Sequence, residues 1–146
     1  MNSTKILVKY ATENCTVDDE IRNTPMINAA QMGNVVLLRV LMEGGANVQR
    51  SNANQQTALH EAALYGYLEV CRLLLDWGVK VDPLDKWQET PLHYAARWGY
   101  LSVVKLLVER GADVGLKNKN GRTARDLSWA WGKTDVVHWL DSVSRV

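Results

Sequence analysis

Four segments of this chain resemble one another and begin at a constant interval of 33 residues. They read TPMINAAQMGN, TALHEAALYGY, TPLHYAARWGY and TARDLSWAWGK, and they start at Thr24, Thr57, Thr90 and Thr123. A fixed period of this length is typical of repeat architectures, in which each unit buries its apolar face against its neighbours. The repeat therefore constrains the fold more than any other feature of the chain.

Within each full repeat the residues predict two helices followed by a turn. Pro25 and Pro91 follow a threonine, as expected for an N-cap hydroxyl and a proline in the first helical turn. Glycines that should end the first helix in a left-handed conformation recur nine residues after each threonine, at Gly33, Gly66, Gly99 and Gly132. An apolar run with helical spacing comes next, such as LSVVKLLVERGADV, and a polar stretch rich in turn formers completes the unit.

The segment TPLHYAARWGYLSVVKLLVERGADV resembles the ankyrin repeat, with its Thr-Pro-Leu-His start, paired alanines, glycine between helices and Gly-Ala-Asp-Val exit. The resemblance covers three full repeats, 24–56, 57–89 and 90–122. It implies an all-α fold, an ankyrin-repeat α-solenoid of stacked helix-turn-helix units with projecting β-hairpins or turns. First helices and hairpins would form a concave groove. We expect residues 1–146 to form a single ankyrin-repeat domain.

The two ends depart from the repeat as end units should. Residues 123–146 are expected to form a C-terminal capping repeat, because residues 124–126 replace Pro-Leu-His and Trp129 stands at an alanine position. Residues 1–23 align with the second helix and hairpin of a unit. We interpret them as an N-terminal cap or half-repeat.

Composition and charge exclude several classes of protein. Seventeen Lys and Arg against sixteen Asp and Glu give a formal charge of +1, without the basic excess that nucleic-acid binding needs. The apolar runs are broken by charges and too short to span a membrane. No secretory signal is recognisable, so we expect a cytoplasmic or nuclear protein with Cys15 and Cys71 as reduced thiols.

No motif for catalysis or metal binding is present in the sequence. His60 and His93 are each the fourth residue of a repeat, and the resemblance implies that their imidazoles hydrogen-bond their own threonine and adjacent backbone. His138 has no Cys or second His at ligand spacing. We therefore expect no enzymatic activity, no metal and no cofactor.

Large side chains recur at one position near the end of the first helix. Trp98 lies eight residues after Thr90, and its counterparts are Met32, Tyr65 and Trp131. The resemblance places this position on the groove, next to Leu64 and Arg97 one residue earlier, and Trp87 adds a ring from the hairpin.

Two interpretations of these rings stay open. Trp98 and Trp131 either pack on each other and on Arg97 as part of the core, or they are exposed anchors for a partner. We favour the second, because core tryptophans should occupy leucine positions. Trp139 does so, and with the cap residue Trp129 it is assigned to structure, while Trp77 fits either role.

These patterns predict an adaptor that binds a peptide or a folded protein and is a monomer when free. The predicted partner-binding residues are Leu64, Tyr65, Lys86, Trp87, Glu89, Arg97, Trp98 and Trp131. Charged side chains of both signs, Glu61, Lys86, Glu89, Lys119 and Arg122, are expected to line the groove or the hairpin tips. Alternatives are a stoichiometric inhibitor of a kinase or transcription factor, self-association, and a methyl-lysine (histone tail) reader with Glu61 or Glu89 completing an aromatic cage.

Overall fold

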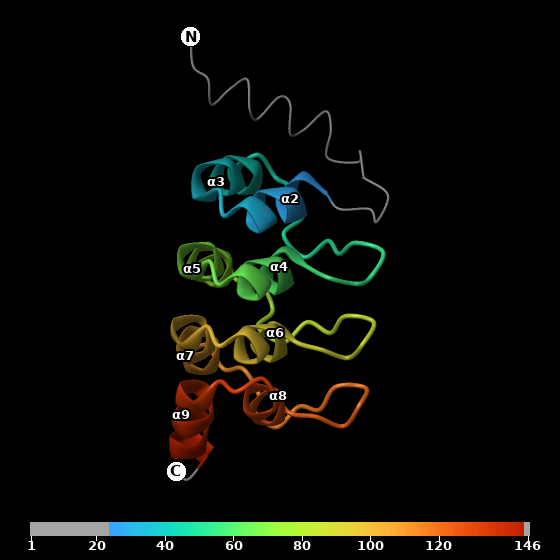
Figure 1. Ribbon diagram of the computed structural model, residues 1–146. Helices are drawn as coiled ribbons and strands as arrows, with labels where there is room; N and C mark the ends of the chain where they lie inside the picture. Colours follow the sequence, from blue (N-terminus) through green and yellow to red (C-terminus); the bar gives the residue numbers. More distant parts are fainter. Residues whose placement is uncertain (1–23, 145–146) are drawn as a thin grey trace.

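The computed structural model describes residues 24–144 and shows helix pairs stacked in one direction (Figure 1). The predicted N-terminal half-repeat, residues 1–23, and residues 145–146 lie outside the described part of the chain. The helices are α2 (Pro25–Met32), α3 (Val35–Glu43), α4 (Ala58–Tyr65), α5 (Leu68–Trp77), α6 (Pro91–Trp98), α7 (Leu101–Glu109), α8 (Ala124–Ala130) and α9 (Thr134–Ser144). The all-α repeat fold expected from the sequence is confirmed.

The first helices pack against one another through the alanine pairs. In α2, α4 and α6 each pair is fully buried, at 0% exposure: Ala29, Ala30, Ala62, Ala63, Ala95 and Ala96. Helix α4 lies between α2 and α6, and α8 extends this row. The second helices form a parallel row of looser contacts, and their leucines, such as Leu38, Leu74 and Leu107, fill the space between the two rows. A continuous core therefore runs along the stack.

The glycine that ends each first helix also makes room for the next repeat. Gly66 has φ 73°, a left-handed conformation that side chains with a Cβ rarely adopt. A Cβ at Gly66 would lie 2.6 Å from Cδ1 of Tyr100, and one at Gly33 would lie 2.9 Å from Cε1 of Tyr67. The backbone conformation and the packing between repeats thus require glycine at the same place.

The two repeat histidines have the role that the resemblance implied. The N–H of Thr57 donates to Nδ1 of His60 over 3.1 Å, and Nε2 of His60 donates to the carbonyl oxygen of Glu89 over 2.8 Å. Because a backbone N–H can only donate, Nδ1 carries no proton and the imidazole is neutral. His93 is bound in the same way, to the N–H of Thr90 (3.0 Å) and the carbonyl of Leu116 (3.0 Å).

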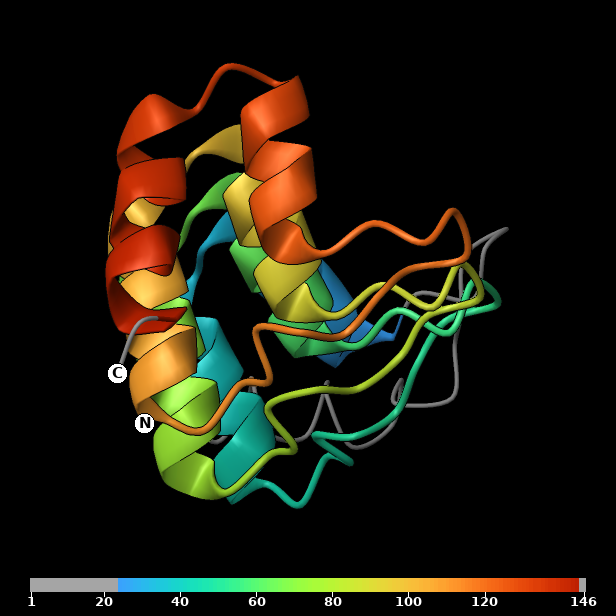
Figure 2. The same ribbon diagram turned by 90° about the horizontal axis from the view of Figure 1, so that it is seen from below.

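The projecting loops are turns, and no strand forms within residues 24–144. Each turn is held by an Asn or Asp side chain; Oδ1 of Asp85 accepts from the N–H groups of Trp87 and Glu89, both over 2.9 Å. Adjacent loops are joined by backbone hydrogen bonds, from Lys86 to Asn54 (3.1 Å) and from Lys119 to Trp87 (3.0 Å). The loops therefore extend side by side from the helix layers (Figure 2).

In the C-terminal unit, the structure confirms one of two tryptophan assignments and corrects the other. Trp139 packs against the core as predicted. Trp129, assigned to structure from the sequence, is 68% exposed. It stands at the position of the buried Ala96, which faces the next repeat, and no further repeat follows α8 and α9 in the described residues. Cys71 is a free, buried thiol, and burial raises its pKa to about 12, while Cys15 lies outside the described part of the chain.

Replacing Gln88 with glycine should stabilise the fold. Gln88 has φ 59°, whereas Gly121 occupies the same position of the next loop with φ 75°. Relief of the left-handed strain outweighs the greater chain entropy of glycine, so we expect the free energy of unfolding to rise by about 0.5 kcal/mol. Urea unfolding measures this change. Gln88→Ala retains a Cβ and should not raise the free energy of unfolding. A lower free energy of unfolding for Gln88→Gly would show that the backbone at Gln88 is not strained.

The buried histidines should make stability depend on pH. Burial lowers the pKa of both His60 and His93 below the ordinary 6.5. Unfolded chains therefore bind protons that the folded protein does not, so the histidine contribution is fully present above the ordinary pKa and decreases below it. The histidine contribution to the free energy of unfolding should fall between about pH 7 and about pH 5. His93→Gln keeps an acceptor for the N–H of Thr90 but cannot become charged. The free energy of unfolding of this variant should therefore decrease less than that of the wild type as the pH falls. An equal decrease for the two proteins would contradict this account.

Candidate functional site

An open groove with a volume of about 410 Å³ lies between the first helices and the projecting loops. It is lined by Gln56, Leu64, Trp87, Glu89, Tyr94, Arg97, Trp98 and Asn120. The structure thus brings together five of the eight residues predicted to bind a partner. The other three, Tyr65, Lys86 and Trp131, do not line this cavity, but each is adjacent in sequence or in space to a residue that does.

The aromatic rings combine features of both interpretations left open by the sequence. Trp98 and Trp131 pack on each other, with ring centroids 5.2 Å apart and planes inclined by 45°. The two residues nevertheless stay 42% and 52% exposed. Tyr65 is also exposed and lies 6.0 Å from Tyr67, centroid to centroid. Mutual packing therefore restricts these rings without removing them from solvent.

Arg97 contacts a carboxylate, an interaction that neither interpretation of the rings included. Its Nη2 donates to Oε2 of Glu89, and Nδ2 of Asn118 donates to the same oxygen over 2.8 Å. Burial alone would raise the pKa of Glu89, but these hydrogen bonds and the charge of Arg97 outweigh it and leave the pKa below its ordinary value. Glu89 is thus an ionised, buried residue that holds Arg97 in place.

A second polar cluster beneath the groove involves residues that the sequence analysis did not single out. The Tyr94 hydroxyl donates to Oδ2 of Asp85 and accepts from Nε2 of Gln56 over 3.0 Å. Tyr94 is buried, and burial raises the pKa of its hydroxyl, so the phenol stays protonated. One signal could have revealed Asp85: Asn52 and Asn118 stand at the same repeat position and hold their turns in the same way.

Exposed lysine and arginine residues stand on the loops that border the groove, and these loop tips are called its rim. The ammonium of Lys86 lies 4.6 Å from the centroid of the Trp87 ring, a cation–π contact. Lys119 and Arg122 are exposed on the next loop. Glu61, expected on the groove surface, is only 2% exposed. It lies on α4 among the first helices, where the packing of adjacent repeats covers it, and the side chain of Gln31 hydrogen-bonds it.

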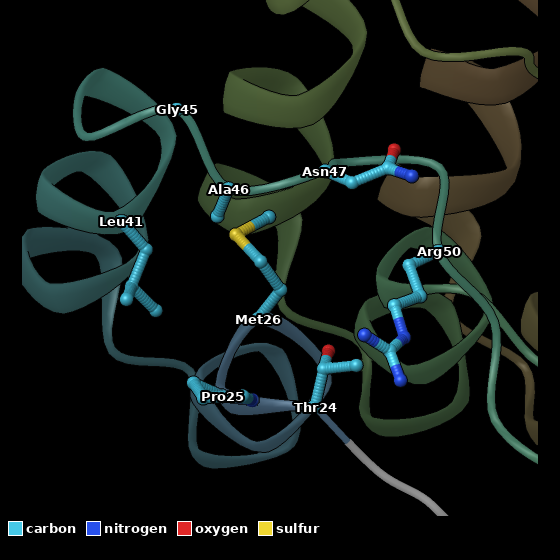
Figure 3. A pocket seen from close by; sticks show the side chains of 8 residues that line it. All are labelled: Thr24, Pro25, Met26, Leu41, Gly45, Ala46, Asn47 and Arg50. Carbon is cyan, nitrogen blue, oxygen red and sulfur yellow. The ribbon is translucent and has the colours of Figure 1, made fainter. Parts of the chain in front are cut away.

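A second cavity, of about 230 Å³, lies between α2, the end of α3 and the loop that follows α3 (Figure 3). Pro25, Met26 and Leu41 supply much of its apolar lining, and Arg50 stands at its edge. None of the residues predicted to bind a partner lies there.

Among residues 24–144, no group of three or more His, Cys, Asp or Glu side chains is placed to hold a metal ion. In the same part of the chain, no helix is long and apolar enough to cross a membrane.

Comparison with protein families matches nearly the whole repeat region. A family model described as Ankyrin repeats (3 copies) matches residues 2–85, and one described as Ankyrin repeat matches residues 87–119. The first match alone covers more than half of the 146 residues. A search of curated proteins gave no match.

Glu61→Gln should stabilise the protein near neutral pH. Burial raises the pKa of Glu61 above the ordinary 4.5, because the ionised carboxylate is poorly solvated. An amide keeps the size of the side chain and can bond Gln31 without a charge, so we expect the free energy of unfolding to rise by about 1 kcal/mol at neutral pH.

This gain should shrink as the pH is lowered, because protonation of the wild-type carboxyl removes the same charge. Urea unfolding of both proteins at several pH values measures it. Glu69→Gln, on an exposed side chain of α5, is the matched control and should change stability little. A Glu61→Gln protein less stable than the wild type at neutral pH would show that the carboxylate stabilises the fold.

Proposed function

The chain belongs to the ankyrin repeat family, and on that premise we propose that it is an adaptor that binds a protein partner in the groove beside Trp98. Ankyrin repeats in general mediate protein–protein interactions. The partner would present a peptide segment or a surface loop. One observation carries the proposal: Trp87 and Trp98, 43% and 42% exposed, both line one groove.

Exposed tryptophans on a concave surface have the properties of interface anchors. Each ring can bury a large apolar area when a partner covers it, and tryptophan is enriched among residues that dominate binding energy. Trp98 extends from the end of α6 and Trp87 from the preceding loop. A side chain of the partner could therefore contact both rings at once.

The polar clusters beneath the groove support a preformed site. Arg97 is bound to Glu89, and Tyr94 is bound to Asp85, whose other oxygen holds the turn that carries Trp87. These contacts link α6 to the loop. A groove fixed in this way would lose little conformational entropy on binding, which favours affinity.

The other functions considered from the sequence have different support. A methyl-lysine cage needs a carboxylate facing the rings, but Glu61 is buried and Glu89 is already bonded to Arg97 and Asn118. Inhibition of a kinase or transcription factor would use the same groove as an adaptor. That role would be a special case of the proposal, distinguished by the activity of the bound partner.

Trp98→Ala should weaken binding far more than folding. We expect peptides selected from a displayed random library on the wild-type protein to bind the variant about 30-fold more weakly, or about 2 kcal/mol. The free energy of unfolding should change little by comparison, because Trp98 is 42% exposed. Fluorescence anisotropy and urea unfolding measure the two quantities.

Trp77→Ala is the matched control, because Trp77 is 48% exposed on α5 and does not line the groove. Its affinity for the selected peptides should equal that of the wild type. Equal losses for the two variants, or none for Trp98→Ala, would rule out the groove as the binding site.

A further inference from the structure

We infer that the groove selects an acidic peptide segment, with carboxylates against Lys86, Lys119 and Arg122 and an apolar side chain between Trp87 and Trp98. The inference rests on the proposed function and adds the chemistry of the partner. From the sequence, charges of both signs were expected on this surface. Burial of the acidic residues changes that expectation.

The exposed charges at the loop tips are all positive. Among residues 52–56, 85–89 and 118–122, the acidic side chains are Asp85 and Glu89, and both are buried. Asp85 accepts from Tyr94 and from the turn backbone, while Glu89 accepts from Arg97 and Asn118. The exposed charged side chains of these three tips are Lys86, Lys119 and Arg122.

The helical side of the groove adds no exposed negative charge among its lining residues. Its acidic neighbour Glu61 is buried, and Arg97 retains guanidinium N–H groups beyond the Nη2 contact to Glu89. Asp82 and Asp113 belong to the opposite ends of their loops, close after α5 and α7 in the chain, where Oδ2 of Asp82 accepts from the N–H of Asp113. Glu89 is paired with Arg97, and Arg122 has Asp126 among its charged neighbours, so Lys86 and Lys119 supply most of the positive charge of the rim in a chain whose overall charge is only +1.

The rim places charge beside an apolar surface. The Lys86 ammonium lies 4.6 Å from the centroid of the Trp87 ring, so a carboxylate that pairs with Lys86 would stand at the edge of the groove. A neighbouring apolar side chain could then enter the cavity of about 410 Å³. The backbone N–H groups of Lys86 and Lys119 donate to adjacent loops and are therefore not free to pair with a peptide backbone. Side chains of the groove would recognise the peptide instead.

A peptide fits this surface better than a nucleic acid does. Affinity for a phosphate backbone comes from many cations along its path, and here three exposed cations gather at the loop tips. Bases stacked on the two tryptophans are the competing occupants, because single strands bind basic grooves with aromatic rings. The experiment below includes them as an outcome.

A selection from a displayed library of random peptides of about 12 residues tests the inference. The library is selected on the wild-type protein and depleted on a folded Trp87→Ala, Trp98→Ala variant. Enriched peptides should contain more Asp and Glu than Lys and Arg, relative to the starting library, and share an apolar residue. Their affinity should fall at least about threefold when NaCl rises from about 50 mM to about 300 mM.

Charge reversal of the rim provides the second arm. Lys86→Glu, Lys119→Glu should weaken binding of the enriched peptides at least about tenfold. Lys80→Glu, Lys105→Glu changes the net charge equally away from the groove and should leave affinity unchanged. If the rim variant does not fold, Lys86→Gln, Lys119→Gln and the salt dependence of the wild type decide the question.

The outcomes separate this inference from the function on which it rests. The acidic partner would be ruled out if the enriched peptides had no excess of acidic residues, or if their affinities did not change with salt or with the rim charges. In either case the groove would remain a binding site. If no peptide distinguishes the wild type from the double tryptophan variant, the proposed function fails as well. Tighter binding of oligothymidylate than of the enriched peptides, lost in the same variant, would replace the peptide with a phosphate polymer.

Discussion

The close stacking of first helices through buried alanine pairs is the contact on which the rest of the structure depends. No repeat has a core of its own, because the apolar face of each unit is buried only when the next unit covers it. Alanine lets the helices approach, and glycine at the helix end leaves space for the following repeat, as the ring of Tyr100 over Gly66 shows. The alignment of the stacked first helices determines where every loop and every helix end lies.

Polar contacts between stacked repeats fix the side chains that form the groove. His60 of one repeat holds its own Thr57 and the carbonyl of Glu89, the last residue of the same repeat, beside the start of the next. The side chain of Glu89 in turn holds Arg97 on α6. These buried contacts remove acidic groups from the surface while leaving tryptophans and lysines exposed. The character of the groove therefore follows from which side chains the fold must bury.

The periodic features could be predicted from the sequence. A structural position that requires one residue type, such as the glycine at the end of each first helix, carries that residue again every 33 residues. Helix caps, left-handed glycines and the histidine role belong to this group. The partner of Arg97, the burial of Glu61 and the exposure of Trp129 could not be predicted. Each depends on the direction of one side chain and on whether a neighbouring repeat covers it, which differ between otherwise equivalent positions.

The central claim, that Trp87, Trp98 and Trp131 are exposed in the free protein while Trp139 packs against the core, can be tested by fluorine NMR of protein labelled with 5-fluorotryptophan. Each signal, assigned by substitution of single tryptophans, is compared in H2O and D2O, because a solvent isotope shift reports contact of the ring with water. The account predicts clear shifts for the three exposed rings and a smaller shift for Trp139. Shifts for Trp87 and Trp98 as small as that of Trp139 would contradict it, because the rings would then belong to the core.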